Sequence, residues 1–129
     1  PDYRLIIPKE SKTQVKLDRA ECIKAIKTAS LFSKMGLYDV EMTLSPTEGQ
    51  VTLSATDSGR GENQVGVDGA IIGDENRITL NYRYLLDGMN AIPSAQVILS
   101  VIDGASPCIL KGEDMPKEKY QYIIMPIRQ

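Results

Sequence analysis

Three lysines in one stretch of the sequence have the spacing of a phosphate-binding surface. Lys24, Lys27 and Lys34 fall within an arc of about 80° when this stretch is placed on a helix at roughly 100° per residue. A basic stripe of this kind contacts phosphates weakly and reads no bases. The same spacing is also typical of an ordinary solvated helix face, so both interpretations stay open on spacing alone.

Nucleophilic catalysis has little support in the composition. The chain contains no histidine, which removes Ser-His-Asp and Cys-His systems, the common zinc ligand sets and the usual general base near neutral pH. A small hydrolase using Ser58 or Cys22 would therefore lack its base. Cys22 and Cys108 are far apart and no secretory signal precedes them, so we expect free thiols in a reducing, cytoplasmic compartment. We predict no catalytic residue and no enzyme.

The glycine-rich and acidic loops also predict no ligand. The stretch "DSGRGENQ" matches neither phosphate-binding glycine pattern and leads into a strand, so it predicts a hairpin turn. The acidic pairs Asp74-Glu75 and Glu113-Asp114 are typical of solvated turns, and magnesium would need further ligands. We expect no metal and no cofactor.

Apolar side chains that a partner surface could cover occur at three places in the sequence. The ends of the chain read "PDYRLIIP" and "YQYIIMPIRQ", without the polar alternation of a solvated edge strand. If the two ends lie near each other, they frame a pocket for an apolar peptide, with Arg128 placed for its polar end. Leu31 and Phe32 follow the lysine stripe, where they suit either core packing or a subunit contact.

The composition predicts a single globular domain. The 129 residues are 42% hydrophobic and 25% charged, and no apolar run approaches the roughly 18 residues of a membrane span. A net charge of −2 argues against a nucleic-acid binder held by bulk basicity. The start without Met, inside a proline-flanked apolar run, suggests an excised domain, which we take as residues 1–129.

A β-α-β-β-β order occurs twice. Asp18, with Glu21 three residues later, predicts a helix start, and Asn81 repeats this cap 63 positions further on, since 81 − 18 = 63. The pattern indicates a duplication and an α+β fold with two helices packed on antiparallel sheet. The expected helices are 18–35, ended by Gly36, and 82–91; the expected strands are 15–17, 37–44, 50–56, 63–72, 78–80, 96–102, 107–111 and 119–125.

Three stretches, "PDYRLIIP", "LNYRYLLDGMNAI" and "YIIMPIRQ", resemble the third, C-terminal domain of the bacterial sliding clamp, the beta subunit of DNA polymerase III. The resemblance spans essentially the whole chain. It implies a DNA-clamp fold whose duplicated units put helices toward an encircled DNA duplex and sheets outside. It further implies a non-enzymatic processivity factor that forms a homodimeric ring, slides on DNA and tethers polymerases.

The resemblance also implies roles for individual residues. Residues facing DNA are Lys24, Lys27, Lys34 and Arg83, and residues at the dimer interface are Leu31 and Phe32. The implied pocket binds peptides of DNA polymerase III, other polymerases, the clamp loader and repair proteins. Its residues here are Pro1, Leu5, Ile6, Pro107, Ile123, Met125, Pro126, Ile127 and Arg128, with Ser106 at the border.

This sequence departs from the commoner family pattern at four positions. Leu5 replaces Arg, Pro107 replaces Ser, Ile127 replaces Met and Gln129 replaces Leu. The replacements keep the pocket apolar but change which peptides fit. The alternative function is a peptide-binding α+β interaction module without a DNA role.

Overall fold

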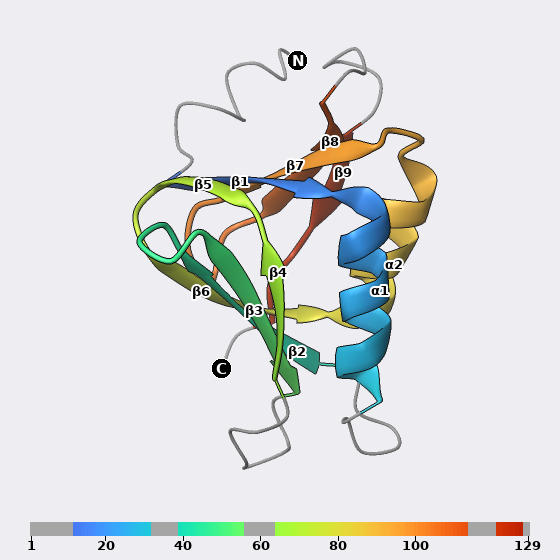
Figure 1. Ribbon diagram of the computed structural model, residues 1–129, viewed down its shortest axis with the longest axis horizontal. Coiled ribbons are helices and arrows are strands. Elements are labelled where there is room, and N and C mark those ends of the chain that lie inside the picture. The colour runs from blue at the N-terminus through green and yellow to red at the C-terminus, as the bar shows by residue number, and fades with distance from the viewer. Residues whose placement is uncertain (1–11, 32–38, 56–63, 114–120, 128–129) are drawn as a thin grey trace.

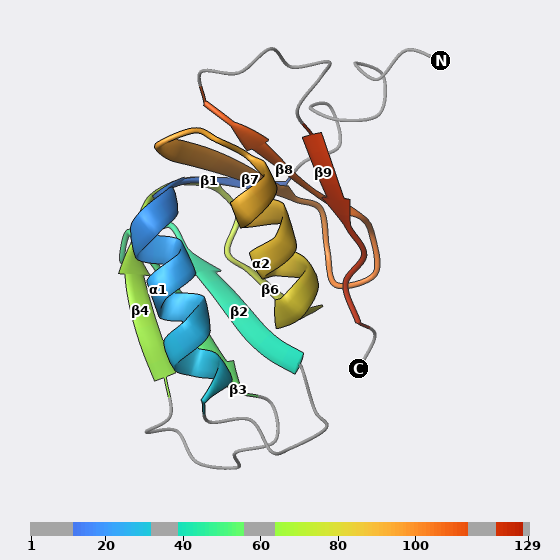
Figure 2. The same cartoon turned by 90° about the vertical axis from the view of Figure 1, so that its right-hand side faces the viewer.

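Two antiparallel sheets and two helices enclose one core (Figures 1 and 2). The computed structural model describes residues 12–31, 39–55, 64–113 and 121–127. Its helices are α1 (Arg19–Ser30) and α2 (Tyr82–Ala91); its strands are β1 (Thr13–Asp18), β2 (Asp39–Ser45), β3 (Gln50–Ala55), β4 (Gln64–Asp68), β5 (Ala70–Gly73), β6 (Asn76–Asn81), β7 (Gln96–Val101), β8 (Cys108–Gly112) and β9 (Gln121–Ile124). The predicted α+β fold is confirmed. In the described ranges no helix is long and apolar enough to cross a membrane.

The two halves of the chain exchange their first strands. The five-stranded sheet has the order β5-β1-β7-β8-β9, so β1 joins the strands of the second half, while the four-stranded sheet β4-β3-β2-β6 takes β6 into the first half. The registers correspond, because Asp18 pairs with Gln96 and Asn81 pairs with Asp39. Each helix cap thus lies opposite the first residue of the strand that follows the other helix, which agrees with the predicted duplication.

Both helices begin at the predicted caps. An Asp18 side-chain oxygen accepts from the Glu21 N–H at 3.0 Å, and the Asn81 side chain accepts from the Arg83 N–H at 2.9 Å. These bonds satisfy backbone donors that the first helical turn leaves open. The predicted helix 82–91 is confirmed.

The first helix ends before the predicted Met35, because α1 ends at Ser30; residues 32–35 of the predicted helix lie outside the described residues. The Leu31 N–H donates to the Thr28 carbonyl at 3.1 Å, a bond that tightens the last turn. Thr28 and Ser30 also donate side-chain hydroxyl bonds to carbonyls one turn earlier. Such local bonds compete with continued helix.

The predicted strand 63–72 is also wrong, because it is two strands in different sheets. β4 pairs with β3 and β5 pairs with β1, and Gly69 stands between them. A Cβ atom at Gly69 would lie 2.9 Å from side-chain carbons of Val15 and Leu17 and 3.1 Å from the Lys16 carbonyl oxygen. The chain can cross from one sheet to the other there only because the residue has no side chain.

The C-terminal segment makes the corresponding crossing in the second half. After β9 the chain reaches the free edge of β6, where the Ile127 N–H donates to the Thr79 carbonyl at 2.7 Å. In the first half Ala70 pairs with Lys16, and Thr79 lies 63 positions after Lys16, since 79 − 16 = 63. Pro126 is buried on the way. The last described residues are therefore part of the sheet framework.

Each helix buries one face in the core. Cys22, Ile26 and Ala29 of α1 are buried, as are Leu85, Met89 and Ile92 in and after α2. Leu86 is half-buried and packs against the same cluster. The largest fully buried side chains on the strands are Leu17, Met42, Leu44, Leu53, Ile78, Leu80, Leu99, Leu110 and Ile124.

The crossing at Gly69 is open to a direct test. We expect Gly69→Ala to lower the free energy of unfolding by about 1–3 kcal/mol, because the added methyl overpacks against β1. Urea denaturation measures the difference, with Gly104→Ala as the control, since a Cβ at Gly104 meets its nearest neighbour at 3.8 Å. Equal stability of the two variants would contradict the proposed crossing constraint.

Candidate functional surfaces

Arg19 holds the two helices side by side. Its Nε donates to the Ser94 carbonyl and its Nη1 to the Met89 carbonyl, both at 3.0 Å, and its backbone N–H donates to the Ala95 carbonyl at 2.9 Å. The start of α1 therefore meets the end of α2, and the helices run antiparallel (Figure 2). A guanidinium at the carboxyl end of a helix is also favoured by the helix dipole. The role of Arg19 was not predicted, because its partners lie about 70 residues away in sequence.

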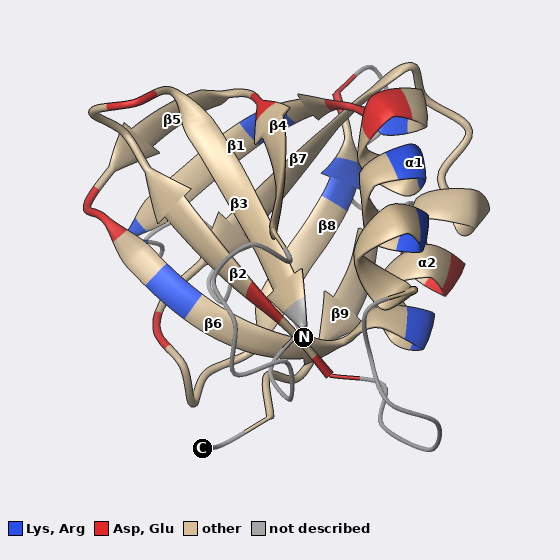
Figure 3. Cartoon of the chain, turned by 60° about the horizontal axis from the view of Figure 1, so that its bottom comes forward, with Lys and Arg blue, Asp and Glu red and all other residues tan. Residues whose placement is uncertain are grey.

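The outer face of the helix pair carries exposed basic side chains. Lys24 and Lys27 lie on the side of α1 opposite the buried residues, and Arg83 is exposed on the first turn of α2. Because the helices are antiparallel, the later part of α1, with Lys27, lies toward the end of α2 that carries Arg83. Figure 3 shows basic segments along α1 and on α2. Neither lysine forms an ion pair within the described residues, and Lys34 lies outside them.

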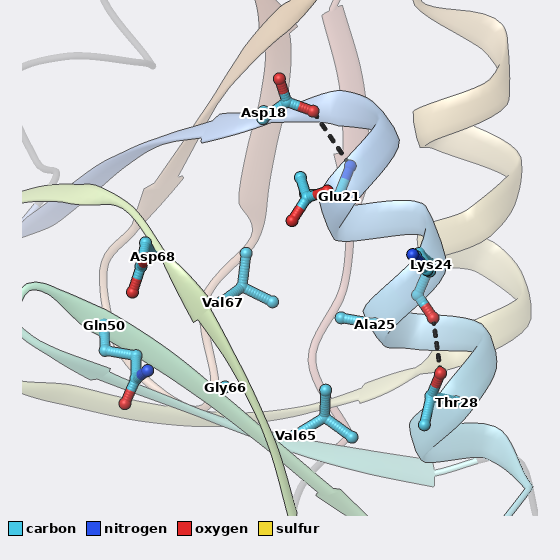
Figure 4. Close-up of a pocket in the computed structure, with 10 residues that line it drawn as sticks. All are labelled: Asp18, Glu21, Lys24, Ala25, Thr28, Gln50, Val65, Gly66, Val67 and Asp68. Carbon is cyan, nitrogen blue, oxygen red and sulfur yellow. Dashed lines mark hydrogen bonds between the residues drawn. The ribbon is translucent and has the colours of Figure 1, made fainter.

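Acidic residues interrupt this face. Glu21 and Asp87 are exposed on α1 and α2. A cavity of about 490 Å³ between α1 and β4 is lined by Asp18, Glu21 and Asp68 as well as by Lys24 (Figure 4). The basic groups of this face therefore form a short cluster within a surface of mixed charge.

One end of this layer has features of a subunit contact. Leu31, directly after α1, is 80% exposed, more than any other large hydrophobic residue of the described ranges. β4 is an edge strand of its sheet, so one row of its backbone groups has no partner strand in the described chain. Phe32 lies outside the described residues.

Apolar side chains form a hollow where α2 meets β9. Tyr84, Tyr122, Ile123, Ile124 and Met125 line a cavity of about 320 Å³. Tyr84, Ile123 and Met125 are 58%, 61% and 56% exposed, although all three side chains are large and apolar. The structure thus brings the predicted Ile123 and Met125 together with Tyr84. Sequence reasoning missed Tyr84, whose only signal was an aromatic residue on the outer face of the predicted helix.

A second hollow lies on the other side of the C-terminal segment. This second hollow has a volume of about 810 Å³. It is lined by Ile127, by Gly104 and Ala105 of the β7–β8 loop, and by residues of β2 and β6. The pKa of Asp103 in this loop is lowered by the hydrogen bond from the Ala105 N–H, at 2.9 Å, and by the Ser106 side chain. These hydrogen bonds favour the ionised form of Asp103.

Of the remaining predicted pocket residues, some lie in the described part of the chain and others lie outside it. Pro107 is exposed at the end of the same loop, and the buried Pro126 separates Met125 in the first hollow from Ile127 in the second. Pro1, Leu5, Ile6 and Arg128 lie outside the described residues, so their predicted roles stay predictions.

The groups that could support other chemistry are occupied or buried. Cys22 and Cys108 are free and buried, and burial raises the pKa of each thiol to about 12. The Glu113 carboxylate forms an ion pair with Lys16 Nζ at 2.8 Å. No group of three or more acidic or cysteine ligands for a metal occurs in the part of the chain that the structure describes. Ser58 and Asp114 lie outside that part.

Comparison with known proteins gives one consistent family. The family described as "DNA polymerase III beta subunit, C-terminal domain" matches residues 4–128. The beta sliding clamps of Synechocystis sp. and Streptomyces coelicolor are each 30% identical over 99% of this chain, which covers 32% and 34% of their lengths. The chain therefore spans about a third of these relatives.

Solved structures agree with the sequence comparison. The DNA polymerase III beta subunit of Thermotoga maritima superposes with a TM-score of 0.83 at 26% identity, over all of this chain and 34% of that one. A sliding clamp of Bartonella birtlesii, bound to griselimycin, gives a TM-score of 0.82 at 22% identity with the same coverage. The second likeness concerns the fold alone.

The buried thiols allow a test of the absence of a cysteine nucleophile. With a pKa of about 12, only about 10⁻⁴ of each thiol is ionised at pH 8, so the thiolate that attacks a disulfide reagent is scarce. We expect neither Cys22 nor Cys108 to react with 5,5′-dithiobis(2-nitrobenzoate) in the folded protein within minutes. Both should react at once in denaturant. Rapid labelling of Cys22 without denaturant would revive the thiol-hydrolase alternative.

Proposed function

The chain belongs to the DNA polymerase III beta subunit family, in which it matches the C-terminal domain, and on that premise we propose that residues 1–129 are one domain of a sliding clamp. The complete protein is a processivity factor that forms a homodimeric ring around duplex DNA. It has no catalytic activity of its own and acts in the cytoplasm. The chain's length, about a third of its relatives, supports this division into domains.

The paired helix face carries this proposal. α1 and α2 form one layer, and Lys24, Lys27 and Arg83 are exposed on its outer side. Long basic side chains that neutralise phosphates bind any sequence equally and exchange readily in salt. A ring retained by topology needs no tighter contact, and base-reading contacts would stop it from sliding. Lys34 completes this face in the proposal.

The ring closes through the end of α1 and the β4 edge. Leu31 and Phe32 supply apolar contact to the first domain of the other subunit. The exposure of Leu31 and the unpaired edge of β4 support this interface, because both need a partner to become covered. The mixed charges beside β4 supply its polar rim.

The two hollows beside the C-terminal segment bind partner peptides. Tyr84, Ile123 and Met125 offer the exposed apolar surface, and Ile127 extends it toward the β7–β8 loop. Pro1, Leu5, Ile6 and Arg128 complete the wall in the proposal. The partners are polymerases, the clamp loader and repair proteins. The griselimycin-bound clamp of Bartonella birtlesii supports a ligand site on this fold.

A charge-reversal pair tests the DNA role. In the complete ring, Lys24→Glu with Lys27→Glu should weaken binding to a short duplex and lower the salt slope by up to about 2 per subunit, because each lost phosphate contact contributes about 0.9. Fluorescence anisotropy across a salt series measures both quantities.

The matched control changes the same net charge elsewhere. Lys12→Glu with Lys16→Glu alters two exposed lysines of the β1 region, where Lys16 is paired with Glu113. We expect a small effect from this pair. If both pairs weaken binding equally, the contact is non-specific charge attraction and the alternative without a DNA role gains support.

Truncation of the apolar surface tests the peptide site. A peptide of the family's clamp-binding type has the sequence Gln-Leu-x-Leu-Phe. Tyr84→Ala or Met125→Ala should raise the dissociation constant of such a peptide about tenfold, or about 1.4 kcal/mol, because each change removes exposed apolar surface from the first hollow. Anisotropy titration of the complete protein measures this, with a scrambled peptide as reference. Ile72→Ala is the matched control, because Ile72 is 64% exposed on β5. An equal loss for Ile72→Ala would place the peptide elsewhere.

A further inference from the structure

Gly88 lies in the interior of α2, where a helix favours almost any other residue. Glycine in a helix interior is destabilising because it has the greatest backbone freedom to lose. Gly88 is buried and faces the sheet that contains β8 and β9. A glycine at such a position indicates that something needs the space of its missing side chain.

That space is filled by the Tyr122 ring. A Cβ atom at Gly88 would lie 2.7 Å from Tyr122 Cδ1, closer than such atoms approach, and 3.1 Å from Tyr122 Cγ, which is a tight contact. It would also lie 3.2 Å from Leu110 Cδ2, and Leu110 is the cross-strand partner of Tyr122. The ring is in contact at its base, close to the backbone, so turning the far end of the side chain would not relieve the contact.

Tyr122 connects this contact to the first hollow. The residue packs against the core and also lines the hollow beside Tyr84, Ile123 and Met125. Leu110, the cross-strand partner of Tyr122, is fully buried, whereas Tyr122 is half-exposed and borders the hollow. A methyl group at position 88 would therefore move the ring toward the hollow.

We infer that Gly88 is a positioning residue for the peptide site: it seats the Tyr122 ring against α2 and so keeps the hollow wide enough for a bulky aromatic side chain of the partner peptide. This inference rests on the proposed peptide-binding function. Gly88 itself touches no peptide. It acts through Tyr122, and it determines which side-chain size the hollow accepts.

The test compares two peptides on the complete protein. One ends in the Phe of the Gln-Leu-x-Leu-Phe sequence, and the other carries Ala in place of that Phe. Gly88→Ala should weaken the Phe peptide about tenfold and the Ala peptide less than twofold, because only the large side chain needs the space. Asn90→Ala, an exposed change on the same helix, is the control and should leave both affinities unchanged.

A variant that lacks the Tyr122 ring distinguishes a positioning role of Gly88 from a general loss of fold. Tyr122→Leu removes the ring, so adding Gly88→Ala to it should change the Phe-peptide affinity less than twofold. Methyl NMR spectra should show shifts at Ile123 and Met125 in Gly88→Ala and none in the Gly88→Ala, Tyr122→Leu double variant beyond those of Tyr122→Leu alone.

The outcomes of these experiments distinguish a failure of the Gly88 inference from a failure of the proposed peptide-binding function. If the parent protein binds neither the Phe peptide nor its Ala version above the scrambled control, the proposed peptide site is overturned and this inference falls with it. If the parent binds and Gly88→Ala keeps the same preference for Phe, only the positioning role is overturned. An equal loss for both peptides, unchanged in the Tyr122→Leu background, also overturns it, because it would show a general loss of fold.

Discussion

The exchange of first strands between the halves is the constraint on which the rest of the structure depends. β1 completes the sheet of β7, β8 and β9, and β6 completes the sheet of β2, β3 and β4. Neither half can cover its own apolar strands alone, because its helix follows a strand that belongs to the other sheet. The exchange therefore sets both helix starts, Asp18 and Asn81, in one layer. Arg19 then fixes the layer by binding the end of α2.

This arrangement places the basic helix face and the apolar hollow on different parts of the surface, and both remain in contact with the core. The helices present one face outward, while their other faces bury Ile26, Leu85 and Met89 against the strands. The apolar hollow lies at the far edge, where α2 meets the last strand. The Tyr122 ring belongs to both regions, since it packs against the core and borders the hollow. A change in the core beneath α2 can therefore reach the binding surface through one side chain.

Local patterns predicted the parts of the fold that local forces determine. The caps at Asp18 and Asn81, the repeated order of elements and the buried faces of the helices follow from short-range bonding and periodicity. The break at Gly69 was missed because periodicity along one strand carries no information on which sheet each end joins. Leu31 carried a visible apolar signal, whereas Arg19 and Tyr84 acquire their surroundings only when distant segments meet. Hydroxyl bonds from Thr28 and Ser30 ended α1 earlier than propensity indicated.

The exchanged strands also bear on how quickly the chain reaches its native state. Thr13 pairs with Val101 and Asp18 with Gln96, so the first strand waits for one of its two partner strands, β7, until most of the described chain has been made. A high contact order slows folding, because the entropy of closing the loop is lost before the contacts reward it. During synthesis on the ribosome, β2, β3 and β4 can pair early and β1 can pair with β5, but the first sheet still lacks β6 and β1 still lacks β7. The domain therefore acquires its cooperative stability late, after β7 has emerged.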